Sequence, residues 1–185
     1  LVTATSVTGL RVHDGRVADV LVSARDTARS GEVLHARRGV ILATGGLSHG
    51  GDLRTRYVPP TAGALTAAVS PEGATRGAVL AQRVGAALTA PTANGALWVP
   101  ASIFTRADGS AGVYPHTVAD RGKPGLIAVD GEGRRFVNEA VSYHEFVRAQ
   151  LRAGRSAIPA WLVCDRDFLW RYGLGLVRPH ARRLD

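Results

Sequence analysis

The chain has 185 residues, enough for one domain with a buried core or for a small domain and part of another. Hydrophobic residues make up 45% and charged residues 21%, a balance typical of folded, soluble proteins and not of disordered ones. No apolar run approaches the roughly 20 residues that span a bilayer, so we expect no transmembrane segment. A single cysteine, Cys164, excludes an intrachain disulfide and a cysteine-rich metal site, and we predict no bound metal.

The net charge of +8 comes almost entirely from arginine, since Lys123 is the one lysine. The arginines are spread along the chain without interleaved aromatic residues, so we expect no nucleic-acid partner. Such a charge can instead attract an anionic ligand. The first residues already resemble a strand and the last ones end without a capped element. We therefore expect an internal piece of a longer, cytoplasmic protein, inactive on its own.

The first forty residues predict a meander of antiparallel strands. Asp14-Gly15 accepts positive φ at both positions and therefore predicts a tight hairpin turn. The unbroken apolar run at 39–43 predicts a strand buried on both faces, which would return to a larger, mostly parallel sheet. The strands expected in this part are residues 10–13, 16–22, 32–36 and 39–43.

Pro59-Pro60 and the small residues that follow, up to Ser70, mark the expected boundary between two domains, residues 1–50 and 51–185. Beyond the boundary, the apolar stripe at 74–88 predicts a helix. Residues 91–115 are rich in Pro, Gly and Ala and predict irregular structure with short strand-like pieces. The remaining elements expected are buried strands at 126–129 and 161–164, and a short helix that Asp165 caps and that runs through Tyr172.

Tyr143 is a candidate for proton transfer. Ser142 and Glu145 have the spacing of a capping box, so we predict a helix that begins at Tyr143 and stops at Gly154. A free phenol is a poor base at neutral pH. Unpaired N–H groups and the helix dipole at a helix N-terminus favour a negative oxygen and would make the phenol usable. The alternative is a tyrosine that only starts the buried stripe of its helix.

Ala43, Thr44, Gly45 and Gly46 follow the predicted strand at 39–43 and are candidates for cofactor binding. Two glycines at a carboxyl strand end let the backbone approach a ligand closely and expose N–H groups to phosphate or ribose oxygens. A Gly-Gly pair can equally be only a turn, and no G-x-G-x-x-G sequence opens a helix here.

Three ordered segments resemble the flavoprotein superfamily of fumarate reductases and succinate dehydrogenases. Arg38 to Gly46 resembles its second flavin-contacting motif, Gly85 to Leu88 a helix end, and Gly133 to Glu139 its G-x-R-F-x-N-E segment. The resemblance covers nearly the whole chain and implies an FAD-dependent oxidoreductase in which Ala43, Thr44, Gly45 and Gly46 contact FAD. The implied fold is α+β: an antiparallel meander that returns to part of an FAD-binding α/β sheet (1–50), plus a mixed α+β substrate-capping domain (51–185).

Residues 138–143 resemble the 3-ketosteroid dehydrogenase branch, in which a tyrosine at this place transfers a proton. The resemblance implies dehydrogenation (or reduction) of a C–C bond next to a ketone, with hydride passing to FAD and Tyr143 handling the proton. The implied partners are a small apolar ketone, with a steroid as one candidate, and an electron acceptor of unidentified kind.

Two alternatives stay open. Dicarboxylate enzymes of the fumarate reductase type use an arginine near the position of Tyr143, and the nearest here, Arg148, lies a helical turn further on. Such an enzyme would need an arginine from another helix. The other alternative is a non-catalytic, basic binding module on the same fold.

Overall fold

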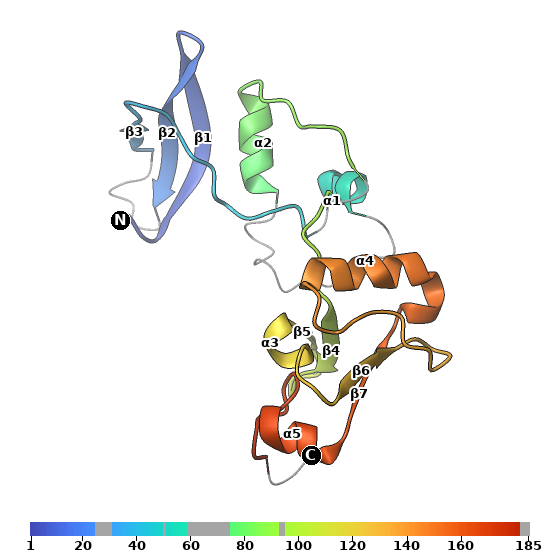
Figure 1. The fold of residues 1–185 in the computed structure, drawn as a ribbon. Helices are drawn as coiled ribbons and strands as arrows, with labels where there is room; N and C mark the ends of the chain where they lie inside the picture. Colours follow the sequence, from blue (N-terminus) through green and yellow to red (C-terminus); the bar gives the residue numbers. More distant parts are fainter. Residues whose placement is uncertain (25–30, 50, 59–74, 93–94, 182–185) are drawn as a thin grey trace. The chain divides into compact units, whose positions relative to one another are not determined.

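The computed structural model describes residues 1–24, 31–49, 51–58, 75–92 and 95–181 (Figure 1). They belong to two compact units, Leu1–Ala93 and Asn94–Asp185. The structure is a mixed α+β fold with small antiparallel sheets. No helix in the described ranges is long and apolar enough to cross a membrane.

The first unit is built on a three-stranded antiparallel sheet in the order β1–β2–β3 (Figure 1). Asp14 and Gly15 have φ angles of 49° and 74°, so the turn between the first two strands has the conformation that Asp-Gly favours. The predicted hairpin and third strand are therefore confirmed. The elements of this unit are β1 (Thr5–His13), β2 (Arg16–Ala24), β3 (Val33–His35), α1 (Gly51–Tyr57) and α2 (Arg76–Arg83).

A buried carboxylate connects the three strands of this sheet. Asp19 on β2 lies 2.8 Å from His13 Nε2 on β1 and 2.6 Å from His35 Nδ1 on β3. The hydrogen bonds with His35 and then His13 hold the pKa of Asp19 below its ordinary range. Each strand thus supplies one member of the cluster.

Residues 39–43 do not form the predicted buried strand, and this prediction is wrong for the structure. The segment pairs with no strand in the part of the chain that the structure describes, and the Ile41 side chain is 93% exposed. A strand buried on both faces needs strands beside it and layers above and below it. The described residues supply none of these, so the expected return to a parallel sheet is not seen among them.

The helix expected at 74–88 is confirmed in a shorter form as α2. The helix ends in a Schellman motif: Ala86 N–H donates to Ala81 O and Gly85 N–H to Gln82 O, both at 3.0 Å. Gly85 has the positive φ of 88° that this motif requires.

Helix α1 was not predicted, because it buries none of its residues and so has no apolar stripe to read. The boundary expected at Pro59 to Ser70 lies outside the described residues, and the assignment of 1–50 and 51–185 to two functions stays a prediction.

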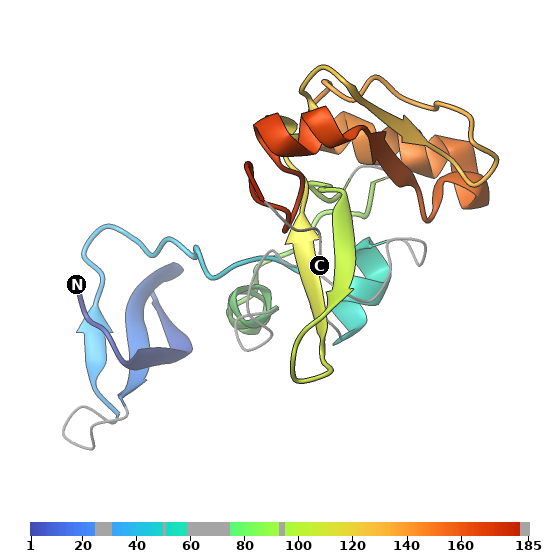
Figure 2. The ribbon, with the colours of Figure 1, turned by 90° about the horizontal axis from the view of Figure 1, so that it is seen from below.

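The second unit contains two antiparallel strand pairs and three α-helices among its described residues. Figure 2 shows the pair β4–β5 as a ribbon with its connecting turn at one end. The predicted strands at 126–129 and 161–164 are confirmed, as are the helices that begin at Tyr143 and after Asp165. The elements are β4 (Ala101–Thr105), β5 (Ala111–Pro115), α3 (Val118–Arg121), β6 (Leu126–Val129), α4 (Tyr143–Ala153), the 3₁₀ helix η4 (Gly154–Ala157), β7 (Trp161–Cys164) and α5 (Arg166–Tyr172).

The irregular structure expected at 91–115 is wrong for its second half, which forms the β4–β5 hairpin. The turn depends on Asp108, whose Oδ1 accepts the N–H of Ser110 at 2.9 Å, and on Gly109, whose φ is 81°. These are short-range turn signals. The many proline, glycine and alanine residues at 91–115 favoured a prediction of irregular structure over a hairpin.

The sheet of β6 and β7 is covered on one face only. Leu126 and Ala128 are buried, whereas Trp161 and Val163 are 49% and 48% exposed. Because side chains alternate along a strand, one face packs on the unit's core and the other stays open. The strand at 161–164 is present as predicted, but the prediction that it is fully buried is wrong.

Replacing Asp19 by Asn should destabilise the protein at pH 7 and remove part of its acid sensitivity. The folded state holds the pKa of Asp19 below its unfolded value of about 4, so the charged carboxylate stabilises the fold above that pH. This contribution is lost as the pH falls through the lower, folded pKa. We expect a lower midpoint of urea unfolding for the variant at pH 7, followed by circular dichroism, and a difference from the wild type that shrinks as the pH falls through the folded pKa of Asp19.

Asp14→Asn is the matched control, because its side chain lies in an exposed turn that asparagine tolerates equally well. Equal midpoints for Asp19→Asn and wild type at pH 7 would contradict the role given to the cluster.

Candidate functional site

Tyr143 is the first residue of helix α4, as the capping pattern predicts. Ser142 is the N-cap, and its Oγ accepts the N–H of Glu145 at 3.3 Å. The Glu145 carboxylate contacts Arg148 Nη1 at 2.9 Å, so an ion pair along the helix takes the place of its expected bond back to Ser142. The Tyr143 side chain is partly buried. Tyr143 therefore lies in the first turn of the helix, the end at which the helix dipole is positive.

The segment from Asp130 to Ser142 crosses from β6 to α4 and is held by polar contacts; we call it the crossing. Asp130 Oδ1 accepts the N–H groups of Glu132 and Arg134, each at 2.9 Å, which forms a tight turn at its start. The bond from the Arg134 N–H is the main reason why the pKa of Asp130 is low. Asn138 Oδ1 accepts the Ala140 N–H at 3.0 Å near its end.

Glu139 fixes the crossing to β6. Its Oε1 accepts the Ala128 N–H at 2.8 Å, and its two carboxylate oxygens contact Arg135 Nε and Nη2 at 2.9 and 2.6 Å. Burial raises the pKa of this carboxyl, but the bonds from Arg135 and Ala128 outweigh burial and leave the pKa below its ordinary range. Glu139 is therefore a charged structural link between strand and crossing.

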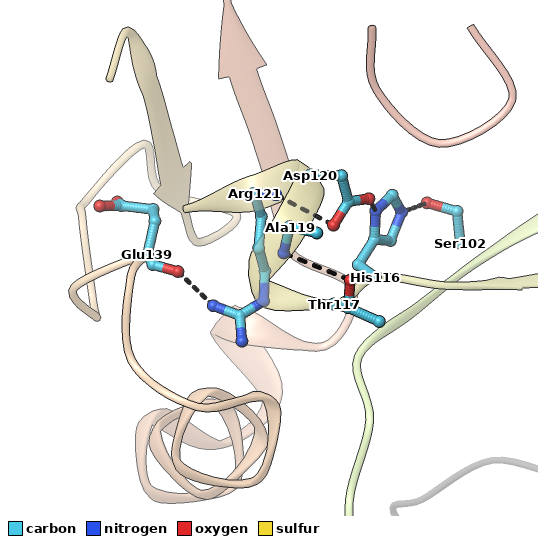
Figure 3. Close-up of polar contacts among 7 residues, drawn as sticks. All are labelled: Ser102, His116, Thr117, Ala119, Asp120, Arg121 and Glu139. Atoms are coloured by element: carbon cyan, nitrogen blue, oxygen red, sulfur yellow. Dashed lines mark hydrogen bonds and ion pairs between the residues drawn. The ribbon is translucent and has the colours of Figure 1, made fainter. Parts of the chain in front are cut away.

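A buried arginine holds the crossing from the other side. Arg121 ends the short helix α3 and is 0% exposed. Its Nη1 donates to the Glu139 carbonyl oxygen (Figure 3). Its Nη2 donates to the Val141 carbonyl oxygen at 2.8 Å. The guanidinium carbon lies 4.7 Å from the centroid of the Phe146 ring, on α4. Sequence reasoning missed this residue because its partners lie 18 and 20 positions further along the chain.

Next to Arg121, a chain of three polar side chains joins α3 to the β4–β5 ribbon (Figure 3). His116 is buried; its Nδ1 lies 2.7 Å from Asp120 Oδ2 and its Nε2 lies 2.7 Å from Ser102 Oγ. The order carboxylate, imidazole, hydroxyl holds the imidazole in one orientation. In the sequence, only the four-residue spacing of His116 and Asp120 indicates that these two side chains could contact each other.

His144, beside Tyr143, is tied to the segment that precedes β4. Trp98 N–H donates to His144 Nδ1 at 3.3 Å, which assigns the ring proton of a neutral imidazole to Nε2. Trp98 is buried, and its indole Nε1–H has no partner among the described residues. The start of α4 is thus held by a cap, by Arg121 and by Trp98.

In the first unit, the loop of Ala43, Thr44, Gly45 and Gly46 lies at the N-terminus of α2. Gly46 O accepts the N–H of Thr75, the residue before the helix, at 3.2 Å. A Cβ added at Gly77 would lie 2.1 Å from Thr44 Oγ1, so only glycine allows this approach without a shift. The four loop residues are exposed, and Gly45 has a φ of 92°.

This arrangement fits a flavin nucleotide. An exposed glycine loop offers backbone N–H groups, and the helix N-terminus beside it favours negative oxygens such as those of a pyrophosphate. Arg76, the first residue of α2, adds positive charge at the same helix start. The structure groups the loop in the first unit and Tyr143 in the second, so FAD contact and proton transfer both stay predictions.

Comparison with known proteins gives consistent matches. A family described as FAD binding domain matches residues 1–175. The 4-oxocyclohex-2-ene-1-carboxylate 5-dehydrogenase of Sinomonas cyclohexanicum is 34% identical over 174 residues, which cover 91% of this chain and 28% of that protein. The 3-oxosteroid 1-dehydrogenase of Mycolicibacterium smegmatis is 34% identical, and the match covers 96% of this chain and 32% of that protein.

A solved structure is similar over nearly the whole chain. It is the crystal structure of 3-ketosteroid delta1-dehydrogenase from Sterolibacterium denitrificans in complex with 1,4-androstadiene-3,17-dione, with a TM-score of 0.71 and 30% sequence identity. The match covers 98% of this chain and 32% of that one. The chain therefore spans about a third of the length of these relatives.

Gly77→Ala should reduce the amount of FAD that the FAD-loaded protein retains, because the added methyl displaces Thr44. Alanine in a helix is otherwise favoured over glycine by about 0.5–1 kcal/mol, so the substitution does not weaken the helix through its intrinsic propensity. The flavin-to-protein absorbance ratio after gel filtration measures the effect, with Gln82→Ala on the exposed side of the same helix as control. An unchanged ratio in Gly77→Ala would argue against flavin contact by the loop.

Proposed function

Because this chain belongs to the FAD-binding domain family, we propose that its protein is an FAD-dependent dehydrogenase that oxidises a C–C bond next to a ring ketone. The relatives are named for a 3-oxosteroid and a 4-oxocyclohexene carboxylate, which both carry an oxo group on a six-membered ring. The proposed substrate is an apolar ring ketone, either a steroid or a smaller ring. The observation that carries the proposal is the place of Tyr143 as the first residue of the capped helix α4.

The residues of the Thr44 loop and the N-terminus of α2 would hold FAD, which when bound supplies the acceptor for the hydride. Tyr143, as phenolate, takes the proton from the carbon next to the carbonyl group. The electron pair of that C–H bond becomes the new C=C bond as the hydride leaves the neighbouring carbon. The proton on the phenol then passes to solvent, which restores Tyr143 for the next turnover.

The surroundings of Tyr143 support this role. Tyr143 is the first residue of α4, directly after the Ser142 N-cap. Ser142 satisfies one of the free N–H groups of the first turn, and the carbonyls before it are bound by Arg121. These contacts fix the backbone on which Tyr143 stands, and a fixed backbone favours the positioned geometry that efficient proton transfer needs.

Tyr143→Phe should keep the flavin absorbance spectrum and lose most turnover. Positioned acid–base groups contribute about 10²–10⁴-fold, and the substitution removes the only oxygen of the side chain. Steady-state turnover of a ring ketone with an artificial electron acceptor measures the loss. Tyr172→Phe is the matched control, because that ring packs against Phe168 in α5, with centroids 5.2 Å apart. Unchanged turnover in Tyr143→Phe would remove the residue from the mechanism.

A further inference from the structure

Arg121 is the most deeply buried charged side chain described in the second unit, and the chemistry of Tyr143 does not use it directly. It lies on a four-residue helix, α3, and is 0% exposed. Its two terminal nitrogens donate to backbone carbonyls, and its Nε–H has no partner among the described residues. A buried cation is costly, and an apolar side chain would fill the same space at a lower cost.

The contacts of Arg121 lie on both sides of Tyr143. The Val141 carbonyl, two residues before the tyrosine, accepts Nη2 at 2.8 Å. The Phe146 ring, three residues after it, lies 4.7 Å from the guanidinium carbon. One rigid, planar group thus bridges the last part of the crossing and the first turn of α4.

The helix that carries Arg121, α3, is held in place through the neighbouring residue Asp120. Asp120 Oδ2 lies 2.7 Å from His116 Nδ1, and His116 N–H donates to Pro100 O at 2.7 Å. Ser102 contacts the far side of the same imidazole at 2.7 Å, as Figure 3 shows. The short helix α3 is therefore tied to the β4–β5 ribbon and does not depend on its own four residues for its place.

We propose that Arg121 is a positioning residue for Tyr143, which sets the place of the phenol through the Val141 carbonyl and the Phe146 ring. The inference rests on the proposed function, because it assigns Arg121 a role only through the tyrosine. A displacement of about 1 Å at a reacting group can cost about 100-fold in rate. Lysine keeps the charge but lacks the planar fork that reaches two carbonyls and stacks on a ring.

A double-mutant cycle in the FAD-loaded holoenzyme tests the inference, with kcat for a ring ketone as the readout. Arg121→Lys should lower kcat by about 10–100-fold with KM and flavin content nearly unchanged, because the loss falls on the reacting geometry. In the Tyr143→Phe background the same substitution should cost less than about 3-fold, since the group that Arg121 positions is gone. Arg148→Lys, on the surface of the same helix and paired with Glu145, should leave kcat unchanged in both backgrounds.

Equal losses from Arg121→Lys in both backgrounds would show a general structural role and overturn the inference, as would an unchanged kcat. Full turnover by Tyr143→Phe alone would instead remove Tyr143 from the mechanism, and the positioning role of Arg121 with it, whereas no turnover of any ring ketone by the wild type would reject the proposed function. Asp120→Asn gives a second route if the lysine variant does not accumulate with FAD bound. It weakens the anchor of α3 and should show a smaller loss of kcat that likewise disappears in the Tyr143→Phe background; an equal loss in both backgrounds would again overturn the inference.

Discussion

A buried guanidinium needs acceptors for its donors, and Arg121 finds two of them in the carbonyls of a segment without regular secondary structure. Burial lowers the pKa of Arg121, while the charges of Asp120 and Glu139 oppose that change and keep the cation stable. The bonds it makes remove the freedom of the crossing at the place where α4 begins. The proposed positioning of Tyr143 depends on this interaction.

Glu139 connects Arg121 with strand β6. Its carboxylate binds the backbone of β6 and the Arg135 side chain, and its carbonyl is an acceptor of Arg121. One residue thus connects a strand, the crossing and α3. Buried polar networks are favourable only when nearly every member is satisfied, and this one leaves Arg121 Nε as its single exception among the described side chains of the cluster. The first unit contains a comparable buried charge, the Asp19 carboxylate, which connects three strands through hydrogen bonds with two histidines.

Sequence reasoning succeeded where the decisive contact lies within a few residues. The Asp14-Gly15 turn, the Ser142 and Asp165 caps and the Gly154 stop are such cases, and all four are present. It failed at 39–43, because an apolar run does not reveal whether strands exist to cover it. Arg121 was missed for a related reason: its partners are distant in sequence and are backbone atoms, which any residue could supply. The role of Tyr143 was predicted from the resemblance to a family and stays a prediction, whereas the capping pattern correctly predicted its place at the start of α4.

The most direct test of the account is anaerobic reduction of the flavin in the FAD-loaded holoenzyme, followed by the loss of its visible absorbance band. The substrates to compare are a 3-oxosteroid, a simple cyclohexanone carrying no carboxylate, and succinate. The account predicts that at least one ring ketone bleaches the band and that deuterium at the carbon next to its carbonyl group slows the bleaching, whereas succinate leaves the band unchanged. Bleaching by succinate alone, or by none of the ketones, would contradict it.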